Sequence, residues 1–223
     1  MTSRADPPRS PAPAATLVGL GLALLLPLLS NLVLPRLAGA APSRALIATG
    51  IAIHWITFAL LLVIVRRWER QPSASIGWRA PRAATVPLGI AAGILIVIAA
   101  GFLTRALNLQ SDVKFVTFLQ SLPLAWRVIL VITAGVFEET AFRGYALERL
   151  APYVGGRWAA AALTLVLFAL AHASAVGTAH LPPILIVGGL VTLLYLWRRD
   201  LLLNMIAHST IDAIGLIVVP ALR

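Results

Sequence analysis

The 223-residue chain contains no cysteine and few charged residues. Without cysteine it forms no disulfide, and it has no thiolate for nucleophilic catalysis or metal binding. Charged residues make up 12% of the chain, against about 25% in a typical soluble domain. Hydrophobic residues make up 60%, and the mean hydropathy is +0.92. This composition excludes an ordinary soluble domain and indicates a polytopic membrane protein.

Acidic residues are much scarcer than basic ones, 8 against 18, and the formal net charge is +10. A basic excess is also typical of nucleic-acid-binding proteins. Here, however, the basic residues lie mainly at the ends of apolar segments, where they set membrane orientation. We therefore expect membrane lipids as partners and no nucleic acid.

Seven apolar segments have roughly the length that a helix needs to cross a bilayer, about 20 residues. The segments are 15–35, 45–65, 84–104, 126–147, 158–175, 183–197 and 201–220. The chain is therefore predicted to be all-α, a membrane bundle of about seven transmembrane helices. Between the third and fourth segments, residues 106–125 mix charged residues with Phe115 and Phe118. That pattern is typical of a short interfacial helix.

The N-terminal residues differ in composition from the rest of the chain. Residues 1–14 are rich in Pro, Ala and Arg and are predicted to form a disordered tail, followed by one membrane domain over 15–220. With the N-terminus in the cytoplasm, eleven Lys and Arg residues fall in cytoplasmic segments and six outside, as the positive-inside rule requires. Alternatively, the first span is a cleaved signal peptide, because Ala38-Gly39-Ala40 resembles a cleavage site. Its apolar run is longer than the roughly 7–15 residues of a signal peptide, so we favour a retained helix.

Three of the 8 acidic residues, Glu138, Glu139 and Asp212, lie within predicted spans. A charge at the centre of a membrane helix costs about 2.5–3.5 kcal/mol on insertion scales, so such a residue indicates a functional site. On a helix, Glu139 and Arg143 share a face and can pair, because they are four residues apart. Glu138 lies about 100° further around the helix and is free to face another partner.

Two other spans also carry polar residues. His172 follows Phe168 by four residues on the fifth span, and Asn204, His208 and Asp212 recur every four residues on the seventh. We expect these polar stripes to face one another around a hydrated cavity. His54, on the second span, has no polar partner near it in the sequence and is interpreted as a packing residue.

The residues of this cavity can support hydrolysis in two ways. A carboxylate beside a neutral imidazole can take a proton from water and return it to a leaving group, while a second imidazole stabilises an oxyanion. Alternatively, Glu138, His172 and His208 hold a divalent metal such as zinc that activates the water. No His-Glu-x-x-His motif is present. The sequence leaves open whether the cofactor is such a metal or whether there is none.

Three short motifs resemble those of the CPBP family of intramembrane proteases, also called the CAAX protease and Abi family. They are Glu138-Glu139-x-x-x-Arg143, Phe168-x-x-x-His172 and His208-x-x-x-Asp212, in that order on separate spans. The resemblance covers about residues 75–215. It implies an all-helical membrane peptidase of glutamic or metallo type. It also implies that Glu138 and His172 activate water, that His208 and Asp212 form the oxyanion side, and that Glu139 and Arg143 support the site.

Asp212 departs from the family pattern, which often has Asn at this position. An aspartate donates a hydrogen bond only when it is protonated, a form that burial favours. Otherwise Asp212 orients His208 or binds a metal with it. Asn204, one turn earlier, is a candidate substitute donor.

These observations predict an intramembrane endopeptidase of a prokaryotic cytoplasmic membrane, with its N-terminus in the cytoplasm. Its expected substrate is a membrane-associated or CAAX-like peptide or protein. Two alternatives remain open: a non-catalytic scaffold or bacteriocin-immunity protein, and a proton-coupled transporter. The absence of an internal repeat in the sequence weighs against the transporter.

Overall fold

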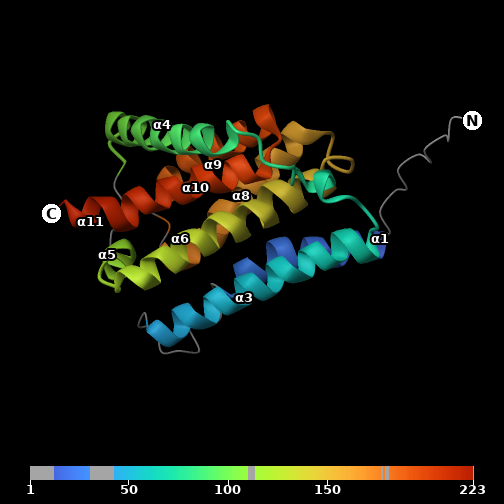
Figure 1. The fold of residues 1–223 in the computed structure, drawn as a ribbon, viewed down its shortest axis with the longest axis horizontal. Coiled ribbons are helices and arrows are strands. Elements are labelled where there is room, and N and C mark those ends of the chain that lie inside the picture. Colours follow the sequence, from blue (N-terminus) through green and yellow to red (C-terminus); the bar gives the residue numbers. More distant parts are fainter. Residues whose placement is uncertain (1–12, 31–42, 110–113, 177, 179–180, 223) are drawn as a thin grey trace, which may run out of the picture.

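The computed structural model describes residues 13–30, 43–109, 114–176, 178 and 181–222, and these residues form helices and no strand (Figure 1). The all-α prediction is therefore confirmed. The predicted disordered tail falls almost wholly on residues 1–12, outside the described residues, and so does Ala38-Gly39-Ala40. The first helix begins at Pro13. The boundaries of the predicted domain stay predictions.

The described residues form seven long helical segments, several of which change from α- to π-helical geometry along their length. The first three are α1 (Pro13–Leu20) with η1 (Gly21–Leu25), α3 (Arg44–Val63) with η2 (Ile64–Trp68), and α4 (Thr85–Ala106). The fourth is α6 (Leu124–Glu138) with η4 (Glu139–Leu147) and α7 (Glu148–Leu150). The last three are α8 (Arg157–Val176), α9 (Leu181–Arg198), and α10 (Leu201–Ala213) with η6 (Ile214–Val218) and α11 (Val219–Ala221). Two short helices lie in the connections, η3 (Ser73–Ile76) and α5 (Lys114–Gln120).

In the part of the chain that the structure describes, five helices are long and apolar enough to cross a membrane: Pro13–Ser30, Arg44–Trp68, Thr85–Ala106, Leu181–Arg198 and Leu201–Ala221. The other two predicted spans are helical but differ from these five. The helix from Leu124 carries charged residues in its middle, and Arg157–Ala173 is a shorter apolar helix. Seven spans therefore stay a prediction. The predicted interfacial helix corresponds to α5, which is short and contacts α8 and η6.

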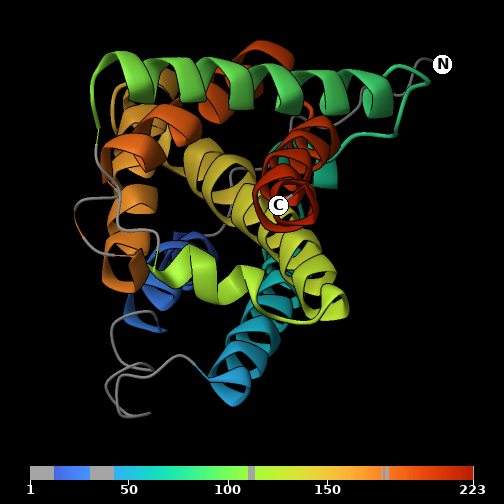
Figure 2. The same cartoon turned by 90° about the vertical axis from the view of Figure 1, so that its left-hand side faces the viewer.

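The helices form two outer layers around a central group. Viewed end-on, α6 runs through the middle of the bundle, with α4 above it and α1 and α3 below (Figure 2). α10 packs against both α4 and α6, and α3 packs against α6 from the other side. Large apolar side chains of α4, such as Leu95 and Phe102, point outward and are 65% and 71% exposed. A surface of this kind suits contact with lipid rather than water.

Glycine allows α10 to approach its two neighbours closely. A Cβ added at Gly93 of α4 would lie 2.6 Å from the Ala207 carbonyl oxygen of α10. A Cβ added at Gly135 of α6 would collide with the Ser209 hydroxyl of α10. Small residues at such crossings let membrane helices pack backbone to backbone. This packing brings the polar stripe of α10 against the end of α6.

Two buried carboxylates tie the helices together at one end of the bundle. Glu69 accepts hydrogen bonds from the Tyr145 hydroxyl at 2.7 Å and the Thr16 hydroxyl at 3.2 Å. The Arg149 guanidinium donates to both oxygens of Glu69, at 2.7–3.2 Å, and also to the Ser75 hydroxyl. We call these five residues the Glu69 cluster. It joins the start of α1 and the end of η2 to η3, η4 and α7.

The second carboxylate, Glu148, lies just beyond the fourth predicted span. It pairs with Arg157 and Arg199, each at 2.6 Å, and accepts a hydrogen bond from the Tyr195 hydroxyl at 3.0 Å. Burial alone would raise the pKa of Glu148. The hydrogen bonds and charges of Arg199 and Arg157 outweigh it, so the pKa of this carboxyl lies below its usual range. We call these four residues the Glu148 cluster.

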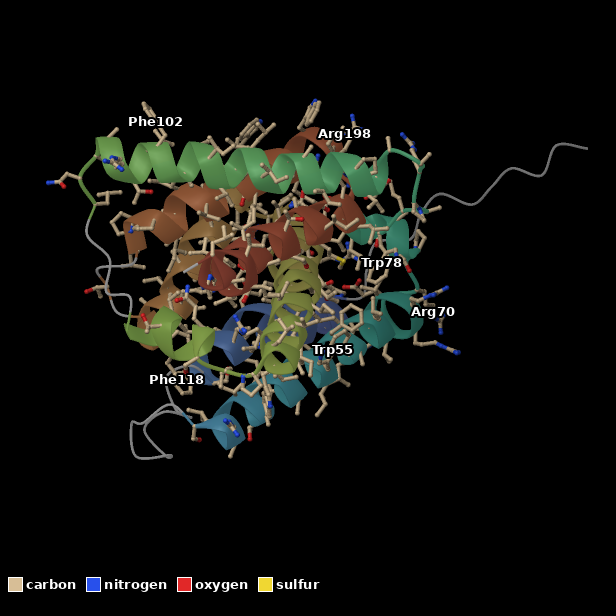
Figure 3. The ribbon with its side chains drawn as sticks, turned by 60° about the vertical axis from the view of Figure 1, so that its left-hand side comes forward. Trp55, Arg70, Trp78, Phe102, Phe118 and Arg198 are labelled. Carbon is tan, nitrogen blue, oxygen red and sulfur yellow. The ribbon has the colours of Figure 1, made fainter. Side chains whose placement is uncertain are left out.

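The loop that follows η3 is fixed beneath the α9–α10 turn. The Gly77 carbonyl accepts a hydrogen bond from the Leu201 amide at 2.9 Å. Gly77 has a φ of +78°, and a Cβ there would lie 2.5 Å from the Tyr195 hydroxyl, so glycine is required on both counts. Figure 3 shows Arg70 and Trp78 at this end of the bundle, with Phe102 and Phe118 toward the other end. We call it the arginine-rich end.

Candidate active site

The fourth helix changes geometry within its charged motif. The motif spacing predicts one regular helix of 3.6 residues per turn through Glu138, Glu139 and Arg143, but the structure is α-helical only to Glu138 and π-helical over Glu139–Leu147. All nine residues of this π-helical segment are buried. π-helical turns are uncommon and often lie at functional sites. The change begins between the two glutamates.

Glu139 is fully buried, and both of its carboxylate oxygens have partners. Oε1 accepts hydrogen bonds from Arg143 Nη1 at 2.9 Å and from His208 Nδ1 at 2.7 Å. Oε2 accepts one from Asn204 Nδ2 at 2.9 Å. The expected Glu139–Arg143 ion pair is therefore present. The same carboxylate also binds two side chains of α10.

Arg143 connects this carboxylate to α9. Its Nε donates to the Thr192 hydroxyl at 3.3 Å, and its Nη2 donates to the Gly188 carbonyl at 3.1 Å. Its guanidinium carbon lies 4.4 Å from the centre of the Phe168 ring, within range of a cation–π interaction. The sequence motifs predict a site formed by the fourth, fifth and seventh spans. The structure adds the sixth span, α9, to the site. The sequence signal for this contact is the pair Gly188 and Thr192, four residues apart on an apolar helix.

Glu138 is placed very differently from its neighbour. Its Oε2 lies 3.7 Å from His172 Nε2 and 3.7 Å from His208 Nε2. Among the described residues, this buried oxygen has no hydrogen-bond partner. A separation of 3.7 Å is too long for a direct hydrogen bond, and polar atoms at such distances are commonly bridged by water. The sequence motifs thus bring Glu138, His172 and His208 together around one free oxygen.

Both imidazoles are oriented by a bond at Nδ1. His172 Nδ1 lies 2.8 Å from the Phe168 carbonyl, and His208 Nδ1 lies 2.7 Å from the Glu139 carboxylate. Because a carbonyl or carboxylate oxygen accepts, each Nδ1 carries the proton. Each Nε2 is then directed toward Glu138 and, in the neutral ring, presents a lone pair.

Asp212 lies at the open side of the same group. Its Oδ2 is 3.7 Å from His208 Nε2, and its side chain is 29% exposed. The suggestion that Asn204 substitutes as an oxyanion donor is wrong. Its amide donates to Glu139 and to the Val191 carbonyl at 3.0 Å, so both donor positions are used inside the bundle.

His54 belongs to this region, although the sequence shows no polar partner for it. Its ring stacks on Phe137 with the centres 4.2 Å apart, as expected of a packing residue. It also interacts electrostatically with Glu138 and His172. The sequence signal for a role in the site is the position of His54, because α3 is a predicted span and a histidine within a span is unusual. The contact itself depends on how α3 packs against α6.

The charges of the site do not balance among its own residues. Three carboxyl groups, those of Glu138, Glu139 and Asp212, face one guanidinium, that of Arg143. Buried unpaired charge is costly, so the site requires further positive charge, supplied by protons or by a cation. Within the described residues, no group of three or more His, Asp or Glu side chains is arranged to hold a metal ion. The donor types of Glu138, His172 and His208 are nevertheless those that bind zinc.

One family model matches part of this helical bundle. A sequence model of the type II CAAX prenyl endopeptidase Rce1-like family matches residues 120–214. The matched segment holds all three motifs, from Glu138 to Asp212. This match supports the resemblance of the chain to the CPBP (CAAX protease) family of intramembrane peptidases, and the apolar helices indicate an integral membrane protein. No curated protein and no solved structure matches it significantly.

Proposed function

We propose that the protein is an intramembrane endopeptidase in which Glu138 activates the attacking water. One observation carries the proposal: the unpartnered Oε2 of Glu138, with two imidazole Nε2 atoms each 3.7 Å away. A water lying beside Glu138 Oε2 and His172 Nε2 would donate a hydrogen bond to each. Glu138 supplies the base, and His172 fixes the position of the water.

The reaction then needs no nucleophilic side chain. Glu138 accepts a proton from water as the water oxygen bonds to the carbonyl carbon of the scissile peptide. The carbonyl oxygen becomes an oxyanion. Glu138 next returns the proton to the leaving nitrogen as the carbon–nitrogen bond breaks. The products are a new carboxylate and a new amine.

His208 and Asp212 would stabilise the oxyanion. His208 donates from Nε2 when it carries a second proton, and its ring is fixed by the bond between Nδ1 and Glu139. Asp212 donates only when protonated. The positive charge that the site requires is consistent with protons on one or both of these residues. Glu139 and Arg143 are positioning residues, because they hold His208 and the helices around it.

A divalent metal is the alternative means of activation. Glu138, His172 and His208 would hold it, and it would supply Lewis acidity and a water that ionises near neutral pH. Metal analysis of the purified protein, with activity measured before and after chelation, separates the two routes. Activity that survives complete removal of metal supports direct activation by Glu138.

The proposed substrate is a peptide or protein held at the membrane, which includes CAAX-like substrates. We propose that the protein lies in a prokaryotic cytoplasmic membrane with its arginine-rich end in the cytoplasm. The Arg residues near the ends of α3, α7 and α9 support this orientation.

A single experiment distinguishes the protease from its rivals. Purified wild-type protein and Glu138→Gln are incubated with a panel of membrane-anchored peptides, and the products are detected by mass spectrometry. Cleavage by the wild type alone supports the protease. Cleavage by neither protein favours a scaffold or immunity protein, whereas proton flux into vesicles that is lost in Glu138→Gln favours a transporter.

A further inference from the structure

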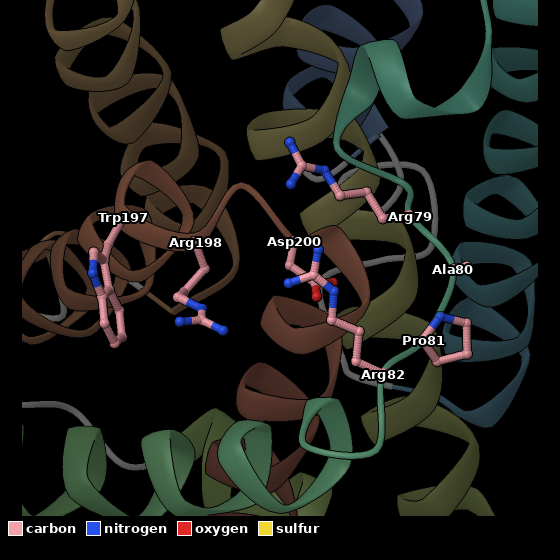
Figure 4. A pocket seen from close by; sticks show the side chains of 7 residues that line it. All are labelled: Arg79, Ala80, Pro81, Arg82, Trp197, Arg198 and Asp200. Carbon is pink, nitrogen blue, oxygen red and sulfur yellow. The ribbon is translucent and has the colours of Figure 1, made fainter.

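A cleft of about 480 Å³ opens at the arginine-rich end, away from the site described above. Its two walls come from distant parts of the sequence. One is the loop before α4, residues Arg79–Arg82, and the other is the α9–α10 turn, with Trp197, Arg198 and Asp200. Figure 4 shows the side chains of both walls.

The loop wall is held in place at both of its ends. On one side, the Gly77 carbonyl accepts the Leu201 amide hydrogen bond described above. On the other, the Arg82 amide donates to the Thr85 hydroxyl at 3.0 Å, where α4 begins. The cleft is therefore a fixed feature of the packing between this loop and the α9–α10 turn.

The arginines of the cleft lack the partners that other arginines at this end possess. Arg149, Arg157 and Arg199 all pair with Glu69 or Glu148. In the described part of the chain, the cleft arginines, Arg79, Arg82 and Arg198, make no ion pair of 4.0 Å or less. Asp200 is engaged elsewhere, because its carboxylate accepts the Leu203 amide at the start of α10. With three guanidinium groups and one carboxylate, the cleft is cationic.

The cleft lies at the depth where a lipid headgroup would lie. Trp197 is 74% exposed, and the Arg198 guanidinium carbon is 5.0 Å from the centre of its ring. Exposed tryptophan at a helix end is typical of a membrane interface. α4 begins at Thr85 beside the cleft, and its outward-facing Val86 and Leu88 are 51% and 43% exposed. A cationic cleft thus borders directly on an apolar surface suited to acyl chains.

We propose that this cleft binds the phosphate of an anionic phospholipid, whose acyl chains lie along the start of α4. Guanidinium groups suit phosphate because each donates two parallel hydrogen bonds. The positive end of the α4 helix dipole adds to the attraction. This site is independent of the proposed peptidase activity.

The proposal is tested by titrating the purified full-length chain, in a neutral detergent, with a short-chain phosphatidylglycerol followed by phosphorus NMR. Short-chain phosphatidylcholine and inorganic phosphate are titrated in parallel. Arg79→Gln, Arg82→Gln and Arg198→Gln are compared with Arg105→Gln, an exposed arginine at the opposite end of α4. Melting temperatures confirm that all four variants are folded.

We expect saturable binding of phosphatidylglycerol and weaker binding of phosphatidylcholine. Each cleft variant should weaken binding about fivefold, the effect of removing one basic residue near an anionic headgroup, and Arg105→Gln should match the wild type. Equal binding of the two lipids, or cleft variants that behave like Arg105→Gln, would overturn the proposal. Displacement by inorganic phosphate at equal concentration would instead indicate a free-phosphate site. Displacement by a peptide with a free C-terminal carboxylate, but not by its amide, would indicate a substrate site.

Discussion

Buried carboxylates lie in two regions of the bundle that differ in how completely they are paired. At the arginine-rich end, the glutamates of the Glu69 and Glu148 clusters accept several hydrogen bonds each. About three turns before Glu148 on the fourth helix, Glu138 faces two imidazoles and, among the described residues, makes no hydrogen bond through Oε2. Both regions bear the cost of desolvating charge, but only the second leaves an oxygen available to a substrate or water. Incomplete pairing, rather than burial of charge as such, marks the candidate active site.

The largest effect is expected at the unpaired oxygen. Glu138→Gln keeps the size of the side chain but removes the base, so cleavage of a membrane-anchored peptide should fall by about 10²–10⁴-fold. Because this oxygen accepts no hydrogen bond from the described residues, the melting temperature should change little. A fall in melting temperature that accounts for the whole loss of activity would contradict the assignment.

The next largest effect, on the free energy of unfolding, is expected at two fully paired glutamates. Glu139→Gln and Glu69→Gln each leave a buried arginine without its counter-charge, so each should lower the free energy of unfolding by about 3–5 kcal/mol. Denaturation in detergent followed by circular dichroism would measure this. Glu139→Gln should also lower the activity per folded molecule, since His208 loses its orienting partner. If Glu69→Gln lowered it as much, the distinction between the two regions would fail.

A smaller effect is expected at the histidine of the second span. His54→Phe keeps the stacking on Phe137 but removes the group that interacts with Glu138 and His172. We expect the pH profile of cleavage to shift by up to about one unit, with folding intact. His54→Leu, which removes the aromatic ring as well, is the matched variant for packing. If the pH profile of cleavage were unchanged in both variants, His54 would have a packing role only.

Asp212→Asn should have a smaller effect still. Asparagine donates a hydrogen bond without needing a proton, so an oxyanion role predicts that activity is retained or raised. Loss of activity in a folded Asp212→Asn protein would rule out the donor role. Asp212 would then be assigned to orienting His208 or binding a metal.

The Glu148 cluster gives a prediction about stability and pH. The pKa of Glu148 is depressed in the folded protein, so its contribution to stability is complete above the pKa of an unfolded glutamate, about 4.3. That contribution should be lost as the pH falls through the lower, folded pKa. Melting temperatures of the wild type should therefore fall over this acidic range more steeply than those of Glu148→Gln. If the melting temperatures of the two proteins fell in parallel with pH, the ion pairs of Glu148 with Arg157 and Arg199 would not stabilise the fold as proposed.

Much of the fold could be predicted from the order of apolar and charged residues along the sequence. Apolar runs of sufficient length and the positions of Pro and Arg located all seven helices within a few residues, because a membrane requires satisfied backbone groups over a fixed thickness. The motif spacing also placed Glu139 against Arg143, since that contact lies within one helix. Such predictions depend on local geometry.

What could not be predicted depends on contacts between helices. Arg143 is held by a backbone carbonyl at Gly188, and no side-chain pattern encodes that bond. His54 meets Glu138 only because α3 packs against α6. The π-helical segment from Glu139 could not be predicted from the sequence. The apolar pattern of a buried helix barely distinguishes π-helical hydrogen bonds, between residues i and i+5, from α-helical ones, between residues i and i+4. The Glu69 cluster likewise joins residues more than 70 positions apart.

The central claim is that the unpaired carboxylate of Glu138 is functional, whereas the paired carboxylate of Glu69, remote from the site, is structural. The most direct test measures the cleavage rate per folded molecule for Glu138→Gln and Glu69→Gln with one membrane-anchored substrate. We predict a loss of at least about 100-fold for Glu138→Gln and a wild-type rate per folded molecule for Glu69→Gln. A wild-type rate in Glu138→Gln, or equal losses in the two variants, would contradict the claim.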